Sequence, residues 1–151
     1  MSMINEQIKA MLEERDMIAS LANISALLYD QYDRLNWAGF YFVRGNELVL
    51  GPFQGKVACM HIPFDKGVCG LTYRTKASQV IHDVHEIEDH IACDSASRSE
   101  LCVPVIVNDT CIMEIDIDSP FVGRFDETFE QEMLQAAKDI ASAYLQHHWS
   151  L

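Results

Sequence analysis

Two neighbouring stretches, residues 99–107 and 110–118, constrain the fold of this chain more than any other feature. Apolar residues recur at every second position in both, which is typical of β-strands, and Asn108-Asp109 between them favours a turn, so the pattern predicts a β-hairpin. A three-residue loop of residues 108–110 would create one wholly apolar face, on which Val107 faces Cys111, Val105 faces Met113, Val103 faces Ile115 and Leu101 faces Ile117. A two-residue loop would instead set Leu101 against Asp116. Because a slip of one residue moves every side chain to the other face, the sequence selects the three-residue loop.

The opposite face of the same hairpin is acidic. In the selected register Glu100 faces Asp118, Cys102 faces Asp116 and Pro104 faces Glu114. Carboxylates that face one another across two strands repel each other. This repulsion is tolerable if water covers the face, if a cation is bound there, or if a carboxyl group stays protonated. The two strands alone leave these three alternatives open.

Cys93 lies in a polar loop just before the hairpin. Its neighbours between Asp94 and Ser99 are small or polar, which is typical of a loop, so we expect solvent or a ligand to reach the thiol. The alternative is a loop cysteine without a role. Glu100 follows Cys93 by only seven residues, so we expect the thiol and the acidic face to be neighbours.

The remainder of the chain predicts long terminal helices and further strands. Apolar residues recur at steps of three and four over 4–32 and 126–146, which predicts two amphipathic helices, the first with room for one break. Strands are expected at 36–43, 47–50, 57–62 and 79–82, and a short helix at 71–75. This order predicts an α+β fold, with a central antiparallel sheet and the long N- and C-terminal helices packed on one face. The terminal helices would also allow a homodimer.

Composition narrows the classes of function. The formal net charge of -12, without a clustered Lys/Arg stripe, disfavours nucleic acid and anionic membranes as partners. No apolar run approaches the roughly 20 residues that cross a bilayer, and a secretory signal is not recognisable, so a cytoplasmic protein is expected. Five cysteines, at positions 59, 69, 93, 102 and 111, form no CxxC motif and disfavour a fixed disulfide framework.

The expected site suits a small organic ligand better than a metal. Trp37 and Tyr41 share one face of the 36–43 strand. Together with a thiol and carboxylates, they would accept a ligand that has a positive group and an apolar or soft arm, such as a free amino acid. His82, His85, His90 and Cys93 offer metal ligands, but their spacing fits no standard zinc pattern, so we expect no metal.

The chain resembles the free methionine-(R)-sulfoxide reductase family of GAF-domain proteins. The resemblance runs in order through Asn36-Trp-Ala-Gly-Phe-Tyr41, Leu50 to Cys59, Gly67-Val-Cys-Gly70, Asp83-Val-His85, His90-Ile-Ala-Cys-Asp94, Ser99-Glu100, Asp116-Ile-Asp-Ser119 and Gly123-Arg-Phe125. It implies a single GAF domain over residues 1–151 and the reduction of free methionine (R)-sulfoxide to methionine. No metal or organic cofactor is implied. The alternative within the same fold is a non-catalytic, ligand-binding signalling module, which we would expect to be attached to an output domain.

The resemblance also implies roles for individual residues. Cys93 would be the thiolate nucleophile, Cys59 the favoured resolving cysteine and Cys69 a second thiol able to take part. A sulfenic acid on Cys93 would condense to an intramolecular disulfide, which a thioredoxin-type dithiol would reduce. Trp37 and Tyr41 would enclose the substrate side chain, while Glu100, Asp116 and Asp118 would hold its amino group and its sulfoxide end. Cys102 and Cys111 lie outside the family pattern and are interpreted as packing residues.

Overall fold

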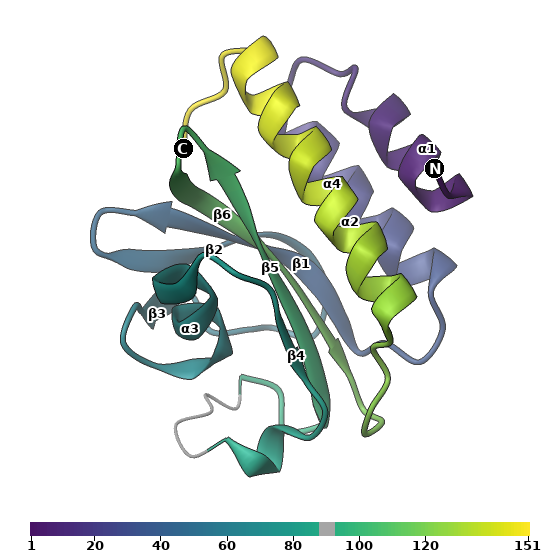
Figure 1. The fold of residues 1–151 in the computed structure, drawn as a ribbon, viewed down its shortest axis with the longest axis vertical. Coiled ribbons are helices and arrows are strands. Elements are labelled where there is room, and N and C mark those ends of the chain that lie inside the picture. Colours follow the sequence, from purple (N-terminus) through teal and green to yellow (C-terminus); the bar gives the residue numbers. More distant parts are fainter. Residues whose placement is uncertain (88–92) are drawn as a thin grey trace.

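A computed structural model describes residues 1–87 and 93–151 (Figure 1). Its elements are, in order, α1 (Met3–Met11), α2 (Met17–Gln31), β1 (Trp37–Arg44), β2 (Glu47–Gly55), β3 (His61–Pro63), α3 (Gly67–Thr75), β4 (Gln79–Ile81), the 3-10 turn η1 (Val84–Glu86), β5 (Ser99–Val107), β6 (Thr110–Ser119) and α4 (Glu127–Gln146). The strands form one antiparallel sheet in the order β3-β2-β1-β6-β5-β4. Figure 1 shows α1, α2 and α4 on one side of this sheet and α3 on the other. The predicted α+β architecture is confirmed.

Each long helix begins at a side chain that caps it. The Asp16 carboxylate accepts a hydrogen bond from the Ala19 backbone N–H at the start of α2, and Asp126 caps α4 through the Phe129 N–H in the same way. Such caps satisfy backbone donors that a helix start leaves without a partner. The sequence allowed one break in the first helix. This break lies between the end of α1 at Met11 and the start of α2 at Met17, where Asp16 caps the new helix. Among the described residues, no helix is both long and apolar enough to cross a membrane.

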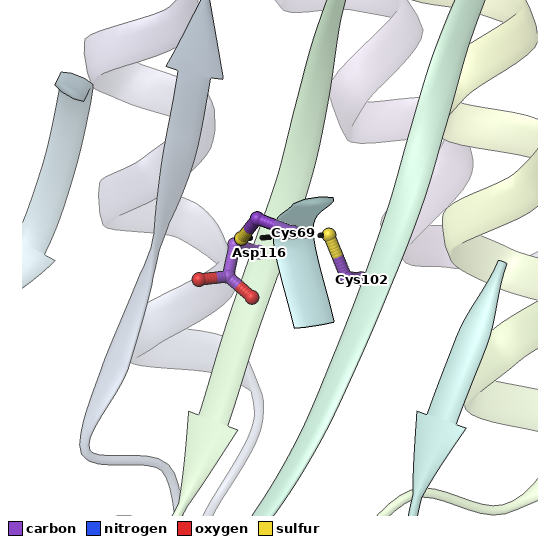
Figure 2. Close-up of side chains that lie close together, drawn as sticks. All are labelled: Cys69, Cys102 and Asp116. Atoms are coloured by element: carbon purple, nitrogen blue, oxygen red, sulfur yellow. Dashed lines mark hydrogen bonds between the residues drawn. The ribbon is translucent and has the colours of Figure 1, made fainter. Parts of the chain in front are cut away.

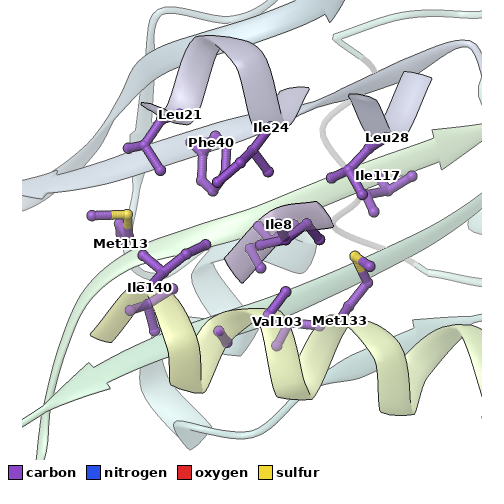
Figure 3. Packing of buried hydrophobic residues seen from close by; sticks show 14 of the residues in the cluster. Ile8, Leu21, Ile24, Leu28, Phe40, Val103, Met113, Ile117, Met133 and Ile140 are labelled. Carbon is purple, nitrogen blue, oxygen red and sulfur yellow. The ribbon is translucent and has the colours of Figure 1, made fainter. Parts of the chain in front are cut away.

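The two faces of the sheet carry two different cores. Figure 3 shows the helix-facing core, in which Phe40, Val103, Met113 and Ile117 of the sheet meet Ile8, Leu21, Ile24, Leu28, Met133 and Ile140 of the helices. The other face holds Trp37, Tyr41, Leu48, Ile62, Val68, Cys69 and Cys102. The predicted alternation along β1 is therefore confirmed. Leu145, near the end of α4, continues the apolar pattern of 126–146 but is 53% exposed and lies outside this core.

The register of the β5–β6 hairpin was predicted correctly, but its loop was not. Glu100 pairs with Asp118 and Leu101 with Ile117, as the apolar face required. The loop, however, has two residues, Asn108 and Asp109, whose positive φ angles of 50° and 64° suit a tight hairpin turn. Val107 therefore pairs with Thr110 rather than with Cys111, and a bulge on β6 between the pairs Ile106–Cys111 and Val105–Met113 restores the predicted register.

Three boundaries between residues 50 and 75 differ from the prediction. Strand β2 continues past Leu50 to Gly55, because a bulge opposite Phe40 accommodates Gly51-Pro52, and β3 pairs with β2 only over 47–49. At Gly39 a Cβ atom would lie 2.3 Å from the Phe53 Cβ, so a glycine is required where the two strands pass. Strand β3 covers 61–63, so it begins four residues later than the expected strand at 57–62. Helix α3 begins at Gly67, four residues early, so Cys69 lies in its first turn.

Candidate active site

A pocket lies on the sheet face opposite the long helices, beside α3. It is lined by Trp37, Tyr41, Ala58, Ile62, Gly67, Val68, Cys69, Cys93, Asp94, Ser97, Glu100, Asp116 and Asp118. Every site residue that the sequence proposed is in this lining except Cys59, which reaches the pocket through a bond to Cys93. The cavity volume is about 30 Å³, which is enough for about two water molecules. The pocket is therefore narrow in this state.

A disulfide joins Cys59 and Cys93 at the mouth of the pocket. The S–S distance is 2.06 Å and the Cα atoms are 5.3 Å apart, although 34 residues separate the two cysteines in sequence. Both side chains are half-buried, as expected for a thiol in a loop. The other three cysteines, Cys69, Cys102 and Cys111, are free thiols and are buried. A reducible pair and a buried thiol therefore share one site.

Two aromatic residues form one wall of the pocket. The rings of Trp37 and Tyr41 lie 5.8 Å apart at 24°, and Phe53, which the sequence did not single out, extends the stack behind Trp37 at 5.1 Å. The Tyr41 hydroxyl donates to the Cys59 carbonyl at 2.9 Å, and the Trp37 indole N–H donates to the Lys56 carbonyl at 3.2 Å. Because their polar ends are bound to the segment that carries Cys59, both rings are held in place.

The floor of the pocket is formed by Glu100 of β5 and by Asp116 and Asp118 of β6. One carboxylate oxygen of each lies within 4.8 Å of the others, and Glu100 and Asp116 are 6% and 5% exposed. Burial, together with the charge of Asp118, raises the pKa of Glu100 to about 8. Burial and the neighbouring Glu100 likewise raise the pKa of Asp116 well above its usual range, and a hydrogen bond joins the two carboxyl groups. The alternative of a water-covered face is therefore wrong, and the raised pKa values favour a proton held by this pair.

Cys102 and Glu114 lie deeper, behind this floor. Neither has exposed surface, and the Cys102 thiol donates to Glu114 Oε1 at 3.3 Å. Figure 2 shows the Cys102 sulfur beside that of Cys69, at 3.8 Å, with Asp116 next to them. Cys102 and Cys111 are buried, as expected of packing residues, but only Cys102 contacts the site. The predicted pairing of Glu114 with Pro104 was the signal that could have placed Glu114 near the floor.

The loop after Cys93 is attached to the start of β1. The Asn36 side-chain amide donates to Asp94 Oδ2 and to Ser97 Oγ, each at 3.0 Å. Asp94 also accepts a hydrogen bond from the Ala96 backbone N–H, which holds the pKa of this carboxyl below its usual range. These contacts fix the described part of the loop, and Cys93 with it, over the pocket. Sequence reasoning assigned no role to Asn36 or Ser97.

The histidine cluster that the sequence offered for a metal is not assembled in the described part of the chain. His82 and His85 belong to neither of the two groups of three potential ligands that residues 1–87 and 93–151 contain. His90 lies outside the described residues. The two groups that do occur are Glu100 with Asp116 and Asp118, and Cys69 with Cys102 and Asp116.

Comparisons with known proteins agree with this geometry. The GAF domain family matches residues 14–144. The free methionine-R-sulfoxide reductase of Escherichia coli (strain K12) is 47% identical over 133 residues, which are 87% of this chain and 81% of that protein. The Saccharomyces cerevisiae protein of the same name is 43% identical over 80% of this chain and 72% of its own length. The Neisseria meningitidis free methionine-R-sulfoxide reductase, solved with its substrate, superposes with a TM-score of 0.93 at 39% identity, covering 96% of this chain and 88% of that one.

Proposed function

Because the chain belongs to the free methionine-(R)-sulfoxide reductase family of GAF-domain proteins, we propose that it reduces free L-methionine (R)-S-oxide to L-methionine. The observation that most supports this activity is the Cys59–Cys93 disulfide at the mouth of a pocket with an aromatic wall and a carboxyl floor. An oxidisable thiol pair supplies the two electrons that the reduction of one sulfoxide needs. No metal or organic cofactor takes part in this reaction.

Substrate recognition follows from the two surfaces of the pocket. The ammonium group of the substrate binds the floor formed by Glu100, Asp116 and Asp118, because a positive charge offsets the repulsion between neighbouring carboxyl groups. The thioether-like arm packs against Trp37 and Tyr41, since sulfur contacts aromatic rings favourably. A molecule of this size needs more room than two waters, so it enters when the disulfide is reduced and Cys93 can move from Cys59.

Reduction begins with attack of the Cys93 thiolate on the sulfoxide sulfur. The oxygen must be protonated or hydrogen-bonded for this attack, and the Glu100–Asp116 pair, whose raised pKa values favour a bound proton, donates to it. The oxygen is transferred to Cys93 as a sulfenic acid, and methionine leaves. A thiol then attacks the Cys93 sulfur and expels water, which forms a disulfide.

Cys59 is better suited than Cys69 to this second attack. A hydrogen bond with Cys102 and burial raise the pKa of Cys69 well above its usual range, so Cys69 provides little thiolate. Cys59 is half-buried and already lies at bonding distance from Cys93. A thioredoxin-type dithiol then reduces the disulfide by exchange. We place this cycle in the cytoplasm, in one GAF domain over residues 1–151, and we expect a homodimer through the terminal helices.

The test is turnover with the separated epimers of free methionine sulfoxide, coupled to thioredoxin, thioredoxin reductase and NADPH. The R epimer should be consumed and the S epimer should not. Cys93→Ser should abolish turnover while its circular dichroism spectrum stays unchanged, and Cys111→Ser, which alters a buried thiol outside the pocket, is the matched control. Binding of a small ligand without NADPH consumption would instead favour the signalling module.

A further inference from the structure

A compact cluster of two thiols and one carboxyl group, Cys69, Cys102 and Asp116, lies between α3 and the sheet (Figure 2), and a second carboxyl group, that of Glu114, contacts Cys102. The sulfurs of Cys69 and Cys102 are 3.8 Å apart, in contact but not bonded. An Asp116 oxygen lies within 4.8 Å of both sulfurs, and Glu114 Oε1 is 3.3 Å from the Cys102 sulfur. The proposed reduction does not use Cys102 or Glu114.

We propose that this cluster is a binding site for a thiophilic divalent cation such as Zn²⁺, with Cys69, Cys102, Asp116 and Glu114 as its ligands. Tetrahedral zinc with Zn–S bonds of about 2.3 Å holds two sulfurs about 3.8 Å apart, which is the observed separation of Cys69 and Cys102. With a Zn–O bond of about 2.1 Å, a sulfur and an oxygen ligand lie about 3.6 Å apart, close to the observed 3.3 Å between Cys102 and Glu114. The two sulfurs, and the Cys102 sulfur with Glu114 Oε1, thus already lie near the separations that a bound ion would impose.

Two buried oxygen atoms give independent support for a cation. Glu114 Oε2 and Asp116 Oδ1 have no hydrogen-bond partner within residues 1–87 and 93–151, and their side chains are 0% and 5% exposed. A buried carboxyl oxygen without a partner is costly, because it has lost its water and gained nothing in return. A cation held by the two neighbouring sulfurs would give both carboxyl groups a positive partner and so offset this cost.

The ligand types select the class of metal. Thiolates favour Zn²⁺ and similar soft or borderline ions, whereas Mg²⁺ and Ca²⁺ require oxygen ligands throughout. Access is available, because Cys69 and Asp116 line the pocket while Cys102 and Glu114 are enclosed behind them. An ion can therefore enter through the pocket, past Cys69 and Asp116, and bind Cys102 and Glu114 of the sheet.

Occupancy of this site would oppose the binding of methionine sulfoxide. The ion would add positive charge at Asp116, one of the carboxylates that the substrate ammonium needs. Zinc should therefore inhibit the enzyme without being required by it. This consequence rests on the proposed function, whereas metal binding itself does not.

Cobalt provides the test of the site, because four-coordinate Co²⁺ with thiolate ligands has visible d–d bands and a thiolate-to-metal charge-transfer band. The protein is used with its Cys59–Cys93 disulfide formed, so that only Cys69, Cys102 and Cys111 are free thiols. One Co²⁺ per chain should bind with both kinds of band, and one Zn²⁺ should displace it. Cys102→Val should remove the charge-transfer band and weaken binding about 100-fold or more, because even outer-shell changes cost 10–100-fold.

Cys111→Val is the matched control, because Cys111 is a buried thiol on the same hairpin and outside the cluster. It should bind Co²⁺ as the wild type does, and thermal melts should show both variants folded. Glu114→Gln should weaken binding but keep the charge-transfer band. Absence of the bands in the wild type, their persistence in Cys102→Val, or a Cys69–Cys102 disulfide formed in place of metal binding would each overturn the site.

The inhibition is tested separately, by adding Zn²⁺ to the thioredoxin-coupled assay. Zinc should inhibit the wild type and Cys111→Val at concentrations that leave Cys102→Val active. Equal inhibition of all three would refute this consequence. Cobalt binding in a protein that reduces no sulfoxide would refute the proposed function and leave the metal site standing.

Discussion

The carboxyl floor should make the ligand-free protein less stable as the pH rises, and Glu100→Gln should remove much of that dependence. Glu100 is buried and its pKa is raised from 4.5 to about 8 in the folded protein. The folded state therefore binds this proton more tightly than the unfolded chain does. The contribution of Glu100 to the free energy of unfolding is fully present below about pH 4.5 and is lost as the pH rises towards 8. Between these values the carboxyl group ionises in the unfolded chain, where water surrounds it, but stays protonated in the folded protein.

The size of the effect follows from the two pKa values. Integrating the difference in proton binding from pH 4 to pH 8 gives a loss of about 4 kcal/mol in the free energy of unfolding. For a chain of this length, that corresponds to a fall of about 8–16 °C in the melting temperature. The neutral amide of Glu100→Gln has no proton to lose, so this part of the dependence should disappear. The variant should be more stable than the wild type at pH 8.

The measurement is thermal or guanidinium unfolding at half-unit steps from pH 4.5 to 8.5, with the Cys59–Cys93 disulfide intact in every protein. Glu13→Gln is the control, because Glu13 is an exposed side chain between α1 and α2. It should retain the wild-type slope, and the six histidines contribute equally to all three proteins. Parallel curves for the wild type and Glu100→Gln would refute the assignment of a raised pKa to the floor.

Three further outcomes follow from the proposed function. Cys59→Ser should release about one methionine per chain from pre-reduced enzyme and then stop, since attack by Cys93 precedes resolution, and undiminished turnover with thioredoxin, measured by NADPH consumption, would assign resolution to another thiol. Asp118→Asn should lower kcat/KM for free methionine (R)-sulfoxide and keep or raise the melting temperature by relieving repulsion with Glu100, whereas a large loss of melting temperature with normal kinetics would mean a structural role. N-acetylation of the substrate removes its cationic partner for the floor at a cost of about 2–5 kcal/mol, so kcat/KM should fall about 30- to 4,000-fold, and equal efficiency on both compounds would show that the floor does not recognise the amino group.

The sequence predicted the arrangement of the sheet wherever a period-two pattern was present. Alternation placed Trp37 and Tyr41 on one face, and the apolar side of the hairpin fixed the pairing of Glu100 with Asp118. Because β1 lies beside β6 in the sheet, the two sets of side chains meet. The pocket lining could thus be assembled from local rules, and most of the candidate site was predictable from the sequence.

Features without periodicity were not predictable. The bulge on β6 and the one at Gly51-Pro52 each insert one residue, which leaves no repeating signal. The contact of Cys69 with Cys102 joins a helix and a strand 33 residues apart, and it depends on how α3 packs against the sheet. That Cys59 and Cys93 lie close together was likewise predicted from the family resemblance and not from their spacing in the sequence. Long-range contacts between irregular segments therefore required the structure.

Burial of the acidic residues lowers the stability of the fold and at the same time gives these residues the raised pKa values that the proposed reaction uses. Apolar side chains at Glu100, Glu114 and Asp116 would complete the second core and avoid the desolvation of three carboxyl groups. Burial instead raises their pKa values, which favours protonated carboxyl groups near the half-buried Cys93. A bound cation reverses this condition, because a positive charge nearby favours the ionised carboxyl and releases its proton. Under the proposed function the substrate ammonium would therefore free the proton that its own sulfoxide oxygen must accept, which couples recognition of the amino group to the chemical step.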